Sequence, residues 1–243
     1  MSSEHIGGRR FQTTRWSLIL AAADPNSSTV ETALASLCEM YWRPVYAFVR
    51  RTGASAEDAR DLTQAFFTRV LEKGFFGQAR QERGRFRSFL LTAVRHFLAN
   101  QRDADQAQKR GRGRTLFSLD IERDGERFLH LEPQEGLTPE QLFERRWALL
   151  VLDHALARLA ARYKGPERQK TFSVLKTFLT GHDAESSAAG AAALGLSADS
   201  FRVTLHRFRR QFGACLREVV SDTVEKPEEV EEELQYLLTI VSR

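Results

Sequence analysis

The segment DARDLTQAFF at residues 58–67 carries the side chains most suggestive of chemistry. Asp58 and Asp61 are two carboxylates with Arg60 between them, and Gln64 follows. A pair of carboxylates can serve as a general acid and base, but these two share one helix surface, without a histidine, a cysteine or a set of metal ligands beside them. We therefore do not expect the pair to be catalytic, which leaves two interpretations, a docking surface and a solvated helix face. We expect no catalytic residue, no metal and no cofactor.

The composition favours a globular protein with a polyanionic partner. The chain has 243 residues, 42% hydrophobic and 28% charged, with 36 Lys and Arg against 32 Asp and Glu and a pI near 9.3. The arginines cluster at internal positions and the acids at the C-terminus, a distribution typical of nucleic-acid binding. The two cysteines are far apart, which fits a reducing compartment. No apolar run approaches the roughly 20 residues that cross a bilayer, so we expect a cytoplasmic protein without a membrane partner.

Hydrophobic residues recur at helical spacing along most of the chain, which predicts an all-α fold. Pro44 should bend or interrupt the first helix, Ser55 and Asp58 form a capping box, and Thr138 caps the helix that Pro139 begins. The expected helices cover 29–52, 55–73, 85–109 and 138–221, with interruptions near 164–167, 181–183 and 195–197.

Composition also divides the chain into two helical domains joined by a flexible linker rich in glycine, proline and charge. The expected parts are an N-terminal extension (1–27), a first domain (28–110), the linker (111–139), a second domain (140–221) and an acidic, amphipathic tail (222–243). The tail is either a solvated helix end or a segment that folds back to mask an arginine-rich helix of the second domain.

That arginine-rich helix belongs to the stretch SSAAGAAALGLSADSFRVTLHRFRRQF at 186–212, which predicts a helix–turn–helix. Ala191 permits close helix crossing, Gly195 supplies a left-handed turn, Ser197 caps the second helix, and Phe201 and Leu205 face inward. The side chains expected to face a DNA major groove are Asp199, Ser200, Arg202, Val203, His206, Arg207, Arg209 and Arg210. An ordinary helical hairpin with a charged face is the alternative.

Three stretches in this order resemble a bacterial sigma factor of the extracytoplasmic-function (ECF) type: DARDLTQAFFTRVLEK, then GRFRSFLLTAVRHFLANQRD, then the helix–turn–helix. The resemblance covers about 28–110 and 140–220. It implies a first domain that binds the coiled coil of the largest RNA polymerase subunit and captures an unpaired promoter strand. The second domain would read the upstream promoter element as duplex.

The resemblance assigns polymerase docking to Asp58, Asp61 and Gln64. Arg60 departs from the family's common acid, and Thr63 departs from its usual apolar residue. These departures suggest a switch, in which phosphorylation of Thr63 adds roughly −2 charge and restores an acidic surface. The controlling partner would be a serine/threonine kinase or an anti-sigma protein, and simple packing of Thr63 is the alternative.

Capture of an unpaired strand needs aromatic or guanidinium platforms and a basic track for the phosphates. The candidate residues are Phe75, Phe76, Arg80, Arg85, Arg87, Arg95 and Asn100. The two phenylalanines could equally belong to the core.

The sequence therefore predicts a sigma factor that is not an enzyme and that directs core RNA polymerase to promoter DNA. A stand-alone helix–turn–helix regulator that binds duplex DNA without polymerase is the alternative, with its first domain used for dimerisation. An enzyme acting on nucleic acid has the least support, because no P-loop or nucleophile–base pair is present.

Overall fold

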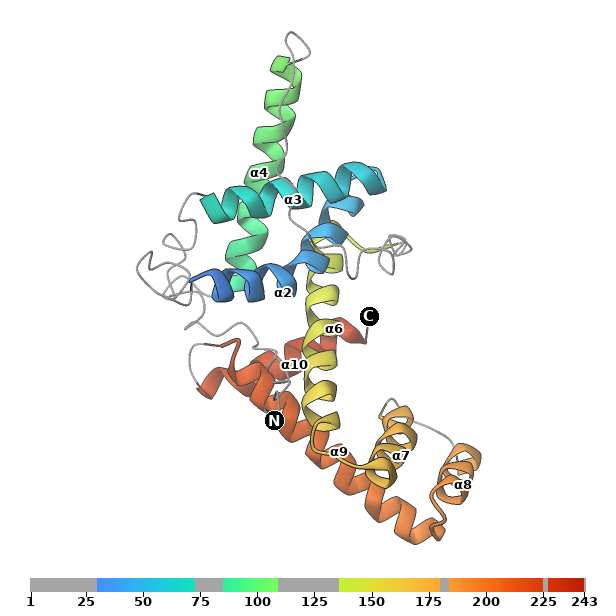
Figure 1. Cartoon of the computed structure of the whole chain (residues 1–243). Helices are drawn as coiled ribbons and strands as arrows, with labels where there is room; N and C mark the ends of the chain where they lie inside the picture. The colour runs from blue at the N-terminus through green and yellow to red at the C-terminus, as the bar shows by residue number, and fades with distance from the viewer. Residues whose placement is uncertain (1–29, 73–84, 109–135, 180–183, 225–226, 243) are drawn as a thin grey trace, which may run out of the picture. The chain divides into compact units, whose positions relative to one another are not determined.

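The computed structural model describes residues 30–72, 85–108, 136–179, 184–224 and 227–242 (Figure 1). These described residues form helices and turns without any strand, which confirms the all-α prediction.

The chain divides into two compact units. The first unit comprises Met1–Leu150 and Asp222–Arg243, and the second comprises Val151–Ser221. The division differs from the expected one in two ways: it falls inside a helix at Leu150, and the tail groups with the first unit. The expected extension 1–27 and most of the expected linker lie outside the described residues.

The first unit is built from helices α2, α3 and α4, the beginning of α6, a short 3-10 turn η4 and the C-terminal helix α10. Their bounds are α2 Val30–Arg51, α3 Ala56–Glu72, α4 Phe86–Gln108, α6 Pro139–Ala160, η4 Pro227–Glu229 and α10 Val230–Val241. Edge-to-face aromatic contacts join the helices. The rings of Phe66 on α3 and Phe97 on α4 lie 5.6 Å apart, and those of Tyr41 on α2 and Phe86 on α4 lie 5.3 Å apart. Of the two effects expected of Pro44, a bend or an interruption, the interruption is wrong, because α2 continues through this buried proline as one helix.

Local side-chain hydrogen bonds set the beginnings of two helices in the first unit. The Ser55 hydroxyl accepts the backbone N–H of Asp58 at 3.0 Å and donates to its carboxylate at 2.6 Å, which confirms Ser55 as the cap of α3 and its pairing with Asp58. At the start of α6, the Thr138 hydroxyl accepts the N–H of Gln141 at 3.2 Å, and the Gln141 side chain accepts the N–H of Thr138 at 2.8 Å. Both helices are therefore fixed by the short sequences that begin them.

The second unit holds the rest of α6, three further α-helices and one 3-10 turn among its described residues. Their bounds are α7 Pro166–Leu175, η3 Lys176–Phe178, α8 Ala184–Ala193 and α9 Ala198–Ser221. The breaks between α6 and α7 and between α8 and α9 confirm the expected interruptions near 164–167 and 195–197, and the one expected near 181–183 lies outside the described residues. Gly165, at φ 88°, precedes Pro166 at the start of α7.

A short turn joins α8 and α9 at the positions where the sequence predicts the helix–turn–helix. Gly195 has φ 63°, and the N–H groups of Gly195 and Leu196 donate to the carbonyls of Ala192 and Ala191, so a Schellman motif ends α8. The hydroxyl of Ser197 accepts the N–H of Ser200 at 3.3 Å and caps α9. Within the unit, Phe201 is 2% exposed, and its ring lies 5.2 Å from that of Phe178.

The C-terminal helix α10 is amphipathic, as expected, and its apolar face is buried in the first unit through Leu234, Leu237 and Ile240. Glu233 shares this face and is 0% exposed. The expectation of a merely solvated helix end is therefore wrong. Among the described residues, no helix is long and apolar enough to cross a membrane.

Candidate polymerase and promoter interfaces

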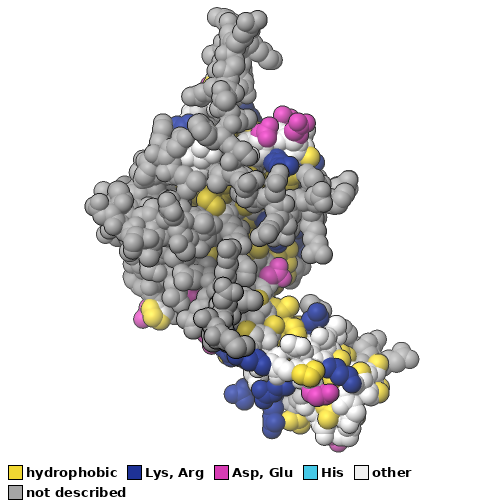
Figure 2. All heavy atoms as spheres, in the orientation of Figure 1, with side chains coloured by type: hydrophobic (Ala, Val, Ile, Leu, Met, Phe, Trp, Pro, Cys, Tyr) yellow, Lys and Arg dark blue, Asp and Glu magenta, His cyan; other side chains and the backbone are white. Residues whose placement is uncertain are grey.

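Helix α3 separates a charged surface from a buried one. Its exposed residues near the N-terminus are Glu57, Asp58, Arg60 and Asp61, and Gln64 is half-buried one turn later. In Figure 2, acidic side chains gather over this end of α3. The predicted docking residues Asp58, Asp61 and Gln64 thus lie along the first turns of one helix.

The opposite face of α3 anchors the helix in the core of the first unit. Ala59, Thr63, Phe66, Phe67 and Val70 are at most 2% exposed. The sequence predicts a buried stripe of Ala59, Leu62, Phe66 and Val70 on this helix. The structure buries Ala59, Phe66 and Val70, adds Thr63 and Phe67, and leaves Leu62 half-buried.

Thr63 is fully enclosed within the first unit. Its side chain is 0% exposed, and its hydroxyl donates a 2.6 Å hydrogen bond to the carbonyl of Ala59 one turn earlier. The structure therefore places Thr63 in a core position, where an apolar residue of similar volume would also fit.

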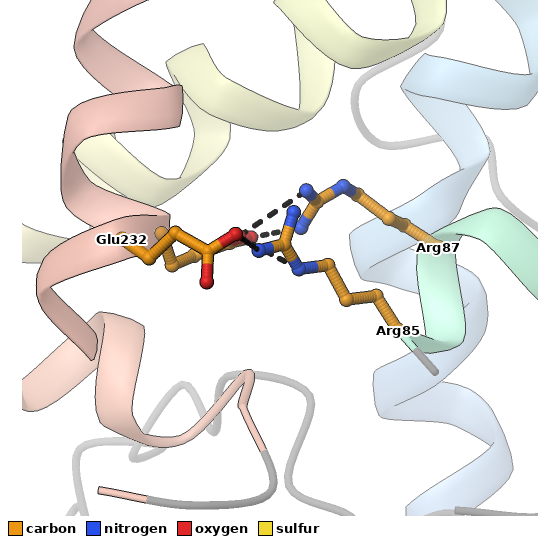
Figure 3. A network of polar contacts seen from close by, with 4 residues as sticks. Arg85, Arg87 and Glu232 are labelled. Carbon is orange, nitrogen blue, oxygen red and sulfur yellow. Dashed lines mark hydrogen bonds and ion pairs between the residues drawn. The ribbon is translucent and has the colours of Figure 1, made fainter. Parts of the chain in front are cut away.

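The residues predicted to bind a single strand fall into three groups. Phe75, Phe76 and Arg80 lie outside the described residues. Arg95 and Asn100 are exposed on α4. Arg85 and Arg87, at the beginning of α4, both face the C-terminal helix α10 (Figure 3).

Arg95 forms an ion pair with Glu140 of α6, with 2.5 Å between the guanidinium and the carboxylate. The hydrogen bond from Arg95 lowers the pKa of the Glu140 carboxyl below its ordinary value, against a smaller opposing effect of burial. Half of the Arg95 side chain is exposed, so the contact is a weak surface pair that leaves Arg95 accessible to a phosphate.

Arg87 is 4% exposed, and its guanidinium forms a two-pronged contact with the buried carboxylate of Glu233. Nε of Arg85 lies 3.0 Å from the same carboxylate, and its terminal nitrogen lies 3.4 Å from Glu232. The sequence reasoning missed this contact. One signal was available, because Arg87 precedes Leu90 and Val94 by three and seven residues and therefore lies at the edge of their buried stripe.

All eight residues predicted to face duplex DNA are exposed on α9. Arg202 pairs with Asp199 at 3.4 Å, while Arg209 donates to the backbone carbonyl of Phe178 at 2.8 Å, which fixes its side chain. Figure 2 shows Lys and Arg side chains gathered on this unit, and Val203, 51% exposed, offers an apolar contact among them. This surface has the basic and apolar groups that major-groove binding requires.

Sequence reasoning also missed the closest approach of α8 to its neighbours. Ala191 is buried as expected, but a Cβ on the adjacent Gly190 would lie 2.7 Å from both the Phe178 and Phe201 rings. Gly190 is thus the position at which α8 requires the smallest residue. The signal was a second glycine in the run SSAAGAAALG.

Within the described part of the chain, no group of three or more histidine, cysteine, aspartate or glutamate side chains lies together as metal ligands would. The candidate binding surfaces are therefore the acidic face of α3, the basic face of α9, and Arg85 and Arg87 beneath α10.

A comparison with protein-family models identifies the family of the chain. The model of the ECF sigma factor family matches residues 43–218, which span both units. Searches of curated proteins and of solved structures gave no match. Sigma factors act in transcription initiation, and theirs is not an enzyme family. With nearly three quarters of its length covered by the family model, the chain belongs to the ECF sigma factor family.

Proposed function

We propose that this chain binds core RNA polymerase through the exposed face of α3 and directs it to promoters through α4 and α9. One observation carries the docking part of this proposal. Glu57, Asp58, Arg60 and Asp61 are all exposed on the first turns of α3, while its opposite face is anchored in the core. A charged surface on a fixed helix can meet a complementary polymerase surface without ordering a flexible segment first.

Promoter binding is assigned to two surfaces. The exposed arginines of α9, with His206 and Val203, would contact the upstream element as duplex, with the arginines neutralising phosphates. Arg95 and Asn100 on α4 would contact the unpaired strand, together with the residues of the preceding segment.

The docking assignment is tested with a pull-down of core RNA polymerase. Asp61→Ala should weaken binding, because it removes an exposed charge from the docking face without disturbing the core. Asp103→Ala is the matched control, since Asp103 is also an exposed acid and belongs to α4 instead of α3. Equal binding by Asp61→Ala and Asp103→Ala would refute docking through α3.

We also propose phosphorylation of Thr63 as a control of docking, and its position defines what the modification would demand. The hydroxyl is buried, so a kinase needs a state in which α3 has opened locally. A phosphate cannot stay in the apolar interior, and Arg60, exposed one turn earlier, is a ready partner for it. Modification would therefore rearrange α3 and bring new charge to its docking face.

Burial also decides which Thr63 variant is informative. Thr63→Glu places an unpaired charge in the core and should destabilise the first unit, so it is a poor mimic. Thr63→Val keeps the volume and removes the acceptor for phosphate. Full promoter activity of Thr63→Val in cells would refute the phosphorylation switch, whereas lost activity with an unchanged melting temperature would support it.

The alternative of a polymerase-independent regulator needs a dimerisation surface on the first unit. The exposed N-terminal part of α3 is charged, and the described large hydrophobic side chains that are exposed, Val203 and Leu238, lie on α9 and α10. This distribution favours polymerase docking over dimerisation through α3.

A further inference from the structure

We propose that α10 is an internal competitor for nucleic acid, which occupies Arg85 and Arg87 and must release them before an unpaired strand can bind there. The inference deepens the proposed function and rests on it, since these arginines belong to the proposed strand-binding set. Figure 3 shows both side chains reaching from the start of α4 toward the acidic residues of α10.

The contact imitates the way a protein holds a phosphate. Both terminal nitrogens of Arg87 bind the Glu233 carboxylate, and Nε of Arg85 binds its second oxygen at 3.0 Å. Glu232 adds a further carboxylate 3.4 Å from Arg85. Guanidinium groups bind carboxylates and phosphates with the same paired geometry, so a nucleic-acid backbone and α10 compete for the same donors.

The surface beneath α10 also contains an aromatic platform. The Arg87 guanidinium contacts two aromatic rings, with its central carbon 4.2 Å from the centre of the Trp147 ring of α6 and 4.9 Å from that of the Tyr236 ring of α10. Trp147 is only 1% exposed. Departure of α10 would remove Tyr236 and uncover Arg87 beside the indole, a combination on which unpaired bases stack.

The contact between α4 and α10 consists of a partly exposed ion pair, Arg85–Glu232, and a buried one, Arg87–Glu233. The Arg85 and Glu232 side chains are 30% and 75% exposed, whereas those of Arg87 and Glu233 are 5% and 0% exposed. A strand can therefore compete first for Arg85 in the partly exposed pair, and exposure of the buried pair requires α10 to move. A helix of 12 residues is marginal in water by itself, so α10 should lose its helical hydrogen bonds once released.

The test uses the full chain and a single-stranded oligothymidylate of about 20 nucleotides, which supplies backbone and bases without sequence information. Hydrogen exchange of the α10 amides is followed with and without the oligonucleotide. Affinity is measured in parallel for Glu232→Gln and for the control Glu228→Gln, an exposed glutamate of η4 that has no ion pair with another described residue.

We expect the α10 amides to exchange faster in the complex, and we expect Glu232→Gln to bind about two- to fivefold more tightly at low salt, as loss of an exposed ion pair implies. Glu228→Gln should bind like the unchanged chain. The proposal is overturned if α10 keeps its protection in the complex, if both substitutions have the same effect, or if no variant binds. The polymerase pull-down reports the proposed function separately, because it requires no oligonucleotide.

Discussion

The packing of α8 against its neighbours predicts that one Gly→Ala substitution destabilises the second unit while another stabilises it. A Cβ at position 190 would lie 2.7 Å from the rings of Phe178 and Phe201, both of which are buried. At Gly213, on α9, the nearest atom to an added Cβ is the end of the Arg217 side chain, at 3.7 Å. The same chemical change therefore meets a closed site on α8 and an open one on α9.

The magnitude follows from two terms. Alanine favours a helix over glycine by about 1 kcal/mol, and this gain is common to both positions. Overpacking of a buried site costs about 1–3 kcal/mol and applies at Gly190 alone. The free energy of unfolding should rise by about 1 kcal/mol for Gly213→Ala, and the two variants should differ by about 1–3 kcal/mol.

Hydrogen exchange of the α8 and α9 amides is the suitable assay, because a melting curve of the whole chain mixes the two units. Exchange through opening of the second unit should be faster in Gly190→Ala than in Gly213→Ala by about fivefold to a little over a hundredfold. Binding to a duplex containing the upstream promoter element should weaken for Gly190→Ala as α9 loses its support.

A matched variant checks the cause. Phe178→Leu removes one of the two rings that an added methyl group would strike, so Gly190→Ala should cost less in the Phe178→Leu background than alone. The reasoning is refuted if Gly190→Ala stabilises the unit as much as Gly213→Ala does. It is equally refuted if the costs of the two substitutions simply add.

Three further outcomes follow from single positions. Glu233→Ala should lower the free energy of unfolding, measured by urea denaturation, by about 3–5 kcal/mol, because it leaves the buried Arg87 without its charged partner. The double substitution Arg87→Met with Glu233→Leu replaces the ion pair by apolar side chains and should restore most of the loss. Gly195→Ala should cost about 1–2 kcal/mol through its left-handed backbone alone, since nothing lies within 4 Å of an added Cβ, and Gly195→Asn should cost less. Burial raises the pKa of the Cys38 thiol from 9.0 to about 12, so the folded chain holds this proton more tightly than the unfolded chain. That contribution to stability should be complete below pH 9 and be lost as the pH rises toward about 12, and iodoacetamide should modify Cys38 far more slowly in the folded chain than in urea.

Much of the fold could be predicted from the sequence because its signals are local. The Ser55 cap of α3, the Gly195 turn and the breaks between helices each depend on residues within a few positions of one another. The exposure of the predicted α9 residues follows from the same helical period that buries Phe201 and Leu205. Pro44 shows the limit of this reasoning, because α2 continues through this buried proline despite the local tendency of proline to end a helix.

The state of individual polar side chains depended instead on contacts between distant parts of the chain. Thr63 has the same sequence neighbourhood as the exposed Arg60 and Asp61, yet the position of α3 in the first unit leaves it fully enclosed. Only the tertiary structure therefore shows that phosphorylation there demands an opening of α3.

The sequence by itself determined that the chain is helical, that α9 presents a basic face and that it resembles ECF sigma factors. Only the tertiary structure decided that Arg87 and Glu233, 146 residues apart, form a buried pair. The physical reason is that helical period and capping are set within a few residues, whereas the choice of partner for a buried charge is a property of the assembled core. Burial without a partner would be costly, so the core that encloses Arg87 must also enclose its carboxylate.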